Sequence, residues 1–280
     1  MKSQYYKWSV VPFLLLFFLI GGCEKEDYTL PVEFKLNFAT RYEDILGGSV
    51  TIDEIGLRLN SIDIRGYREQ GEDVFFTRDF SNGKNFIINS TSASMTERFD
   101  IPQGAYNPIS FSFIFEPDAD EGDLMDDLLE WLEDFEEEFE ELEEDDDDDL
   151  EDLQEDLGEI IEDYLEDITP CIMVKGKFIH NGSTKRIVIV VNDPLTFQIL
   201  GKNRNGGSEI ILDKNMENHG ELQINPSYWF SALTPSMLNN AFVGLIDDEE
   251  YIFLSKHVNS QLYGTIFNRI QESTILRINE

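Results

Sequence analysis

Apolar and polar residues alternate along several stretches of the chain, and this alternation restricts the fold more than any other feature. It is clearest in Val32–Phe38, in Ile55–Ile64 (IGLRLNSIDI) and in Ile109–Phe115 (ISFSFIF). Successive side chains of a strand point to opposite faces, so a period of two is typical of a half-buried β-strand. These stretches therefore predict a domain built mainly from β-sheet.

Shorter apolar stretches extend the pattern, and turn signals such as Asn82-Gly83 and Gly206-Gly207 separate them. Many short strands without alternating long helices favour an antiparallel β-sandwich, of an Ig-like or transthyretin-like type. The further strands are expected at Asp73–Phe80, Phe86–Asn89, Ile172–Ile179, Arg186–Val191, Leu195–Leu200, Glu209–Leu212 and Glu221–Ile224.

Two helices are expected to close this domain near the C-terminus. Thr234-Pro235 matches a helix N-cap followed by Pro at the first helical position. The second helix is indicated by apolar residues that recur every four positions, which gives one apolar face. These residues are Val258, Leu262, Ile266 and Ile270.

An extremely acidic segment interrupts the β pattern. From Asp118 to Asp167 the chain carries 30 Asp or Glu and no Lys or Arg, whereas the other 27 acids face 21 bases. This segment therefore holds 30 of the 36 net negative charges. Because phosphate backbones require clustered Lys and Arg, the composition excludes nucleic-acid binding. The acidic segment should instead attract cations and basic proteins.

Within the acidic segment, apolar residues recur at steps of three and four, which is a helical period. We expect residues 117–169 to form an inserted helical hairpin whose two arms pack together and project from the sandwich. Asp145–Asp149 would form the turn, because Asp is a poor helix former. The two apolar stripes are Leu124, Leu128, Leu132, Phe135, Phe139 and Leu142, then Leu150, Leu153, Leu157, Ile160, Tyr164 and Ile168.

The N-terminus has the organisation of a secretion signal. Lys2 and Lys7 precede an apolar run, Val10–Ile20, which is the length of a signal-peptide core and too short for a comfortable membrane span. The stretch LIGGC, ending at Cys23, resembles a bacterial lipobox. That resemblance implies cleavage before Cys23 and acylation of its thiol and new amine, which would anchor the chain in a membrane. An ordinary secretory signal that happens to precede a Cys is the alternative.

Further stretches carry a resemblance to a class of uncharacterised β-sandwich lipoproteins of Bacteroidota. They are the opening strand Val32–Phe38, EIGLRLNSIDIRG, FDIPQGAYNPISFSF, and INPSYWF followed by NSQLYGTIF, in addition to the lipobox. The stretch CEKED, at Cys23–Asp27, begins at the lipobox Cys. CEKED is similar to the surface-export signals of those lipoproteins, which implies display on the outer face of the outer membrane. The resemblance implies an envelope location and a binding or structural role, and it brings no catalytic residues. The resulting organisation is a signal peptide at 1–22, a lipidated tether at 23–31, a sandwich at 32–116 and 170–280, and the hairpin at 117–169.

Motifs for catalysis are missing from the sequence. The three histidines, His180, His219 and His257, are isolated, and Cys171 is expected to be a buried free thiol. No GxSxG, Walker or dinucleotide motif occurs. The many carboxylates leave a glycosidase pair open, although no two of them stand out.

Two groups of residues are candidates for ligand binding. Asp118, Asp120 and Asp123 form a loose Asp/Gly loop before the first expected helix, which suits weak calcium binding or simply a turn. An EF-hand frame starting at Asp145 fails, because Leu150 stands where Gly is required. Tyr228 and Trp229 suit stacking on a glycan or packing in the core.

These observations favour a lipid-anchored envelope protein without catalytic activity or a required cofactor, which has a binding or structural role. One alternative is a surface protein whose hairpin is stiffened by weakly bound Ca²⁺ or Mg²⁺. Another is a hydrolase acting on glycans or peptides. The expected partners are the membrane, through the lipid, and cations, basic proteins or glycans.

Overall fold

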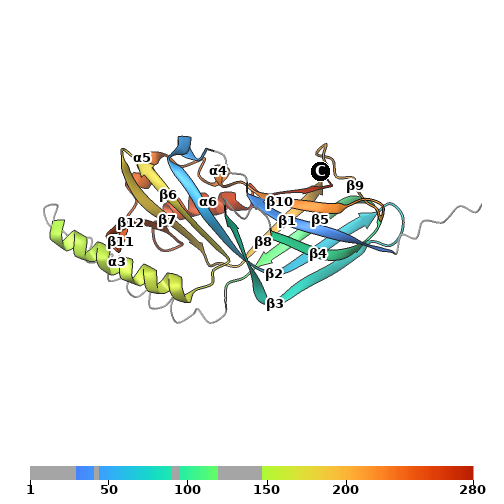
Figure 1. Ribbon diagram of the computed structural model, residues 1–280, viewed down its shortest axis with the longest axis horizontal. Helices are drawn as coiled ribbons and strands as arrows, with labels where there is room; N and C mark the ends of the chain where they lie inside the picture. The colour runs from blue at the N-terminus through green and yellow to red at the C-terminus, as the bar shows by residue number, and fades with distance from the viewer. Residues whose placement is uncertain (1–29, 41–43, 90–94, 119–146, 280) are drawn as a thin grey trace, which may run out of the picture.

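The computed structural model describes residues 30–40, 44–89, 95–118 and 147–279 (Figure 1). The strands are β1 Pro31–Thr40, β2 Val50–Arg68, β3 Val74–Asn89, β4 Met95–Pro102, β5 Gly104–Phe115, β6 Ile172–His180, β7 Ser183–Val191, β8 Leu195–Lys202, β9 Ile210–Leu212, β10 Asn218–Ile224, β11 Gly244–Ile246, β12 Glu249–Leu254 and β13 Ile275–Ile278. The helices are η1 Leu46–Gly48, α3 Asp147–Asp167, α4 Pro226–Trp229, α5 Pro235–Asn239 and α6 Ser260–Ile270. No helix within these ranges is long and apolar enough to span a membrane.

The strands form one continuous, curled sheet in the order β11-β12-β7-β6-β2-β5-β8-β13-β10-β1-β4, with β3 and β9 added beside β2 and β5 (Figure 1). The mainly β class is confirmed. The prediction of a purely antiparallel arrangement is wrong, because the sheet is mixed: β1 with β10, β12 with β7, and β13 with β8 are parallel pairs among otherwise antiparallel ones. Each of these pairs joins strands that are distant in the sequence, which leaves no local signal of strand direction. The division into two packed sheets of an Ig-like or transthyretin-like sandwich stays a prediction.

Strand β2 is the longest strand and connects the two halves of the sheet. Its residues Val50–Leu57 pair with β6, and Leu59–Arg68 pair with β5. Both partners lie along the same edge, because β3 pairs with Glu54–Gly66 on the other edge. The chain therefore leaves β5 and returns to β6 at one point on β2, next to Arg58.

Strand β3 corrects one expected turn. Asn82-Gly83 lies inside a single continuous strand instead of separating two strands. The register between β2 and β3 shifts at Leu59/Ser61, so the extra residues form a bulge. Gly83 has a φ of +66°, a conformation that suits Gly, and a β carbon there would clash with Nε of Arg58.

The concave side of the sheet is filled by aromatic and branched side chains. Phe38 stacks on Phe86 with ring centroids 4.9 Å apart and meets Phe113 edge-on at 6.0 Å. The alternation in β1 and β5 directs these rings inward, as the sequence predicts. Such aromatic pairs add about 0.5–1.5 kcal/mol beyond the burial of their area.

Strands β3 and β4 are brought together by side chains. Phe76 and Phe99 meet edge-on at 6.4 Å, and Lys84 forms an ion pair with the buried Glu97. A charged residue that points inward from an outer strand discourages pairing with a further strand. This ion pair therefore discourages a further strand from pairing where β3 and β4 meet.

Helix α3 is the second arm of the expected hairpin, and its helical period is confirmed. The first arm lies outside the described residues, so the hairpin itself stays a prediction. The sequence predicted that the apolar stripe of α3 contacts the other arm of the hairpin. In the structure this stripe packs on the outer side of β7, β11 and β12. The buried cluster between helix and sheet contains Leu157, Ile161, Ile168, Val188, Val190, Phe253 and Val258.

The turn expected at Asp145–Asp149 is wrong for its last three residues, because α3 begins at Asp147. Negative side chains interact favourably with the positive end of the helix dipole, within the first turn. This position offsets the low helix propensity of Asp. Asp145 lies outside the described residues.

Both expected C-terminal helices are confirmed. Oγ1 of Thr234 accepts a hydrogen bond of 3.3 Å from the Met237 amide, so Thr234 caps α5. The apolar face of α6 buries Leu262, Tyr263, Ile266 and Ile270. At the start of α6, the side-chain amide of Asn259 donates to the carbonyl oxygens of Phe242 and Phe253, both at 2.9 Å, which joins α6 to β12.

Candidate binding surface

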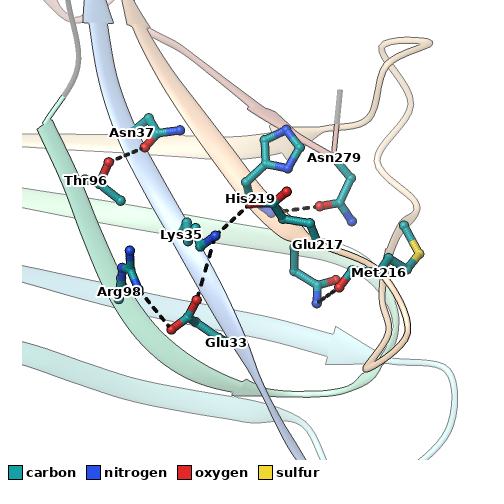
Figure 2. Close-up of polar contacts among 10 residues, drawn as sticks. Glu33, Lys35, Asn37, Thr96, Arg98, Met216, Glu217, His219 and Asn279 are labelled. Atoms are coloured by element: carbon teal, nitrogen blue, oxygen red, sulfur yellow. Dashed lines mark hydrogen bonds and ion pairs between the residues drawn. The ribbon is translucent and has the colours of Figure 1, made fainter.

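The outer side of β4, β1 and β10 carries a dense group of polar side chains. Because Phe34, Leu36 and Phe38 of β1 point into the core, the intervening residues point outward. The register places Lys35 between Arg98 of β4 and His219 of β10. We call this surface the polar face, and Figure 2 shows Glu33, Lys35, Asn37, Thr96, Arg98, Glu217, His219 and Asn279 on it.

Ion pairs organise the polar face. Nζ of Lys35 lies 2.7 Å from a carboxylate oxygen of Glu217 and 4.0 Å from Glu33 (Figure 2). Arg98 reaches the other oxygen of Glu33 at 3.5 Å. The hydrogen bond from Lys35, and its charge, lower the pKa of the Glu217 carboxyl below its usual value. Exposed pairs of this kind contribute little stability, so their main effect is to hold the side chains in place.

His219 has unused hydrogen-bonding capacity. Its Nδ1 atom is enclosed and has no hydrogen-bond partner among the described residues. Its backbone is fixed by Asn279, whose side chain accepts from the His219 amide at 3.0 Å and whose amide donates to the His219 carbonyl at 2.8 Å. An unpaired polar atom of this kind is unfavourable, and because it is enclosed, a ligand on the surface does not reach it in this conformation.

A loop at residues 213–217 separates two surface cavities beside the polar face. The buried Asn218 holds the loop, because its side chain donates to the carbonyl oxygens of Asp213 at 2.9 Å and Met216 at 3.3 Å. One cavity measures about 280 Å³ and the other about 380 Å³, and Lys214 lines both. Lys35 and Glu217 also line the second cavity. These volumes lie near the lower end of the range for small-molecule sites.

The aromatic candidates have different environments. Trp229 is fully buried, and its indole N–H donates to Oγ of Ser273 at 2.7 Å, so its ring takes the packing role. Tyr228 stays exposed and donates its hydroxyl to Glu272 at 3.0 Å. Arg269 lies over one face of the Tyr228 ring, 5.1 Å from its centroid. The prediction that a ligand stacks on both rings is therefore wrong for Trp229. Of the two residues, only Tyr228 lies at the surface.

Of the calcium candidates, only Asp118 lies in the described part of the chain. Its carboxylate is 2.6 Å from Nη1 of Arg58, and its amide donates to the Thr169 carbonyl at 3.3 Å. Arg58 is itself buried, and it also donates to the Asn82 carbonyl at 3.0 Å. Asp118 thus fixes the point where the insertion joins the sheet. Asp120 and Asp123 lie outside the described residues.

Two further described residues with reactive side chains are Cys171 and His257. Cys171 is buried in the core, as the sequence predicts, whereas Cys23 lies outside the described residues. Burial lowers the pKa of His257, and the neighbouring Lys256 adds to this effect. Within residues 30–40, 44–89, 95–118 and 147–279, no group of three His, Cys, Asp or Glu side chains is placed to hold a metal ion.

The part of the polar face that lies on β1 could have been predicted from the sequence. Alternation in Val32–Phe38 already directs Glu33, Lys35 and Asn37 outward. Their partners on β4 and β10 have no local signal, because both pairings join distant segments. Comparison with protein-family models, with curated proteins and with solved structures returns no significant match.

Proposed function

We propose that this chain is a lipid-anchored protein of the bacterial cell envelope, without catalytic activity, that binds its partner through the polar face. The observation that carries the proposal is the position of Cys23, seven residues before the first described residue, Leu30. Seven residues span at most about 25 Å when fully extended. A lipid on Cys23 would therefore hold the folded domain close to the membrane surface.

The polar face supports a binding role. It presents cations and carboxylates in alternation, and ion pairs order these side chains. Such a surface suits a polar partner with many hydroxyl or amide groups, such as a glycan or a peptide. The predicted envelope location would bring both kinds of partner within reach.

The anchor is tested by the substitution Cys23→Ser. We expect wild-type protein to fractionate with membranes and the variant to be released or to remain uncleaved, because the acylated thiol is lost. The measurement is labelling with radioactive palmitate together with membrane fractionation. Cys171→Ser is the matched control, since it changes the other cysteine and should leave labelling intact. Unlabelled wild-type protein would contradict the anchor.

A second candidate function is a response to divalent cations. The exposed side of α3 carries only acids among its charged residues with described side chains: Asp152, Glu155, Asp156, Glu159, Glu162 and Asp163. Their mutual repulsion weakens the helix by roughly 0.2–0.5 kcal/mol for each pair at i,i+4. Divalent cations that bind between the carboxylates would reduce this repulsion.

We expect millimolar Ca²⁺ to raise the midpoint of thermal unfolding of the full chain more than NaCl of equal ionic strength does. Weak extracellular calcium sites have dissociation constants of about 10⁻⁴–10⁻³ M. Circular dichroism at 222 nm would follow the transition. An equal shift with NaCl would mean that screening alone acts on α3.

A further inference from the structure

The end of the sheet where β1 begins is formed by four segments, and hydrogen bonds join three of them. We call it the tether end: the start of β1, the turn at residues 69–73, the turn at Gln103 and the loop at 213–217. The Gln103 amide donates to the Leu30 carbonyl at 3.0 Å, and Arg68 reaches the Gln103 carbonyl at 3.3 Å. The Glu69 amide donates to the Ala105 carbonyl at 3.1 Å.

Exposed apolar side chains concentrate at the tether end. Phe75 is 58% exposed, more than any other large apolar residue among those described, and Tyr67 beside it is 47% exposed. Their rings meet edge-on with centroids 5.7 Å apart. Five of the eleven exposed large apolar residues of the described chain lie at this end: Leu30, Tyr67, Phe75, Ile211 and Met216.

The position of these residues indicates what covers them. The tether end is the part of the fold nearest to Cys23, because at most about 25 Å of extended chain separates Leu30 from that residue. The tether end carries charges of both signs: Lys214 stands between Ile211 and Met216, and the exposed acids Glu69, Glu72 and Asp73 lie in the turn between Tyr67 and Phe75. Tyr side chains favour the interface between membrane and water, where the ring is buried and the hydroxyl is hydrated.

The charge distribution favours the same orientation. Helix α3, with its acidic exposed side, lies at the opposite end of the molecule from the start of β1 (Figure 1). Anionic lipids would repel the acidic side of α3 more strongly than the tether end, whose acids are partly balanced by Arg68 and Lys214, and this difference would turn the tether end toward the bilayer. A contact between the tether end and the bilayer would add to the membrane affinity that the acyl chains provide.

We propose that the tether end rests on the phospholipid bilayer, with Tyr67 and Phe75 seated at the lipid–water interface. This inference rests on the lipid anchor of the proposed function. It adds a defined orientation: the polar face lies close to the membrane along the side of the domain, and α3 extends away from it.

The test is fluorescence quenching in the full, lipid-bearing chain. Phe75→Trp and, at the opposite end, the matched control Ile179→Trp are each reconstituted into phosphatidylcholine vesicles with or without brominated acyl chains. Ile179 is 45% exposed, so both positions present a new indole to solvent. We expect bromine to lower the added emission of Phe75→Trp at least twofold more than that of Ile179→Trp, after subtraction of the wild-type signal.

The outcomes separate this inference from the anchor. Mass spectrometry of the N-terminal peptide reports acylation of Cys23 in the same samples. Acylated protein with equal quenching of the two variants would overturn the bilayer contact and leave the proposed anchor in place. Protein without acyl chains would overturn both. A blue-shifted Phe75→Trp emission that does not respond to bromine would mean that another protein surface covers this end, which also overturns the proposal.

Discussion

Replacing Gly158 by Ala should destabilise the protein by about 1–3 kcal/mol, even though Ala is the better helix former. Gly158 lies in the middle of α3, where the helix approaches β11 closely. A β carbon at this position would lie 1.7 Å from the carbonyl oxygen of Leu245, which is a backbone atom. The helix must therefore move away from the sheet, and the cluster around Leu157 and Ile161 loosens.

Gly264→Ala is the matched control for this prediction. Gly264 also lies inside a helix, α6, but a β carbon there meets nothing within 4 Å. This change should stabilise the protein by about 0.5–1 kcal/mol, because Gly in a helix is entropically unfavourable. Urea unfolding measures both variants. If both changes stabilise the protein equally, α3 does not pack on β11.

Replacing residues 117–169 by a short Gly/Ser turn should leave the β-sheet folded but expose an apolar surface. The two ends of the insertion meet beside Arg58, so a short connection can close the gap. Removal of α3 uncovers Val188, Val190 and Phe253, which are buried beneath it. Each uncovered side chain costs about 1.5–3 kcal/mol as an upper estimate.

Far-ultraviolet circular dichroism should keep its β signal in this variant, whereas binding of the dye ANS and self-association should increase. The control is the same shortened chain with Val188→Thr and Val190→Thr, which should bind less dye. A shortened chain that stays monomeric and binds no dye would contradict the packing of α3 on the sheet. Loss of the β signal would mean that α3 is required for folding of the sheet itself.

The missed strands have a common physical cause. In β12, Ile252, Phe253 and Leu254 are all buried, because the core covers one face and α3 the other. A strand covered on both faces has no alternation, so the period of two disappears. Strands β11 and β13 are too short for a pattern, with three and four residues. Strand β4 also escaped the sequence analysis, although its burial alternates at Thr96–Ile101.

The run Ile187–Val191 contains a signal that could have located α3. Five consecutive apolar residues, all buried, indicate a strand that is covered on both faces. The apolar stripe of α3 is, of the two amphipathic stripes expected in the acidic segment, the one nearer to this run in the sequence. Considered together, these two features predict contact between α3 and β7 in place of contact between two helical arms alone.

The sequence by itself determined which segments are strands and helices wherever one face is apolar and the other polar, as in β1, β5 and α6. Such a pattern follows from local geometry, because side chains alternate along a strand and recur every three to four residues along a helix. Only the tertiary structure decided which strands are neighbours. It alone brought Lys35 to Glu217, set α3 on the sheet and gathered Leu30, Tyr67 and Phe75 at one end. These arrangements depend on contacts between distant segments, and their energy comes from the burial of shared surfaces, which no single stretch of sequence records.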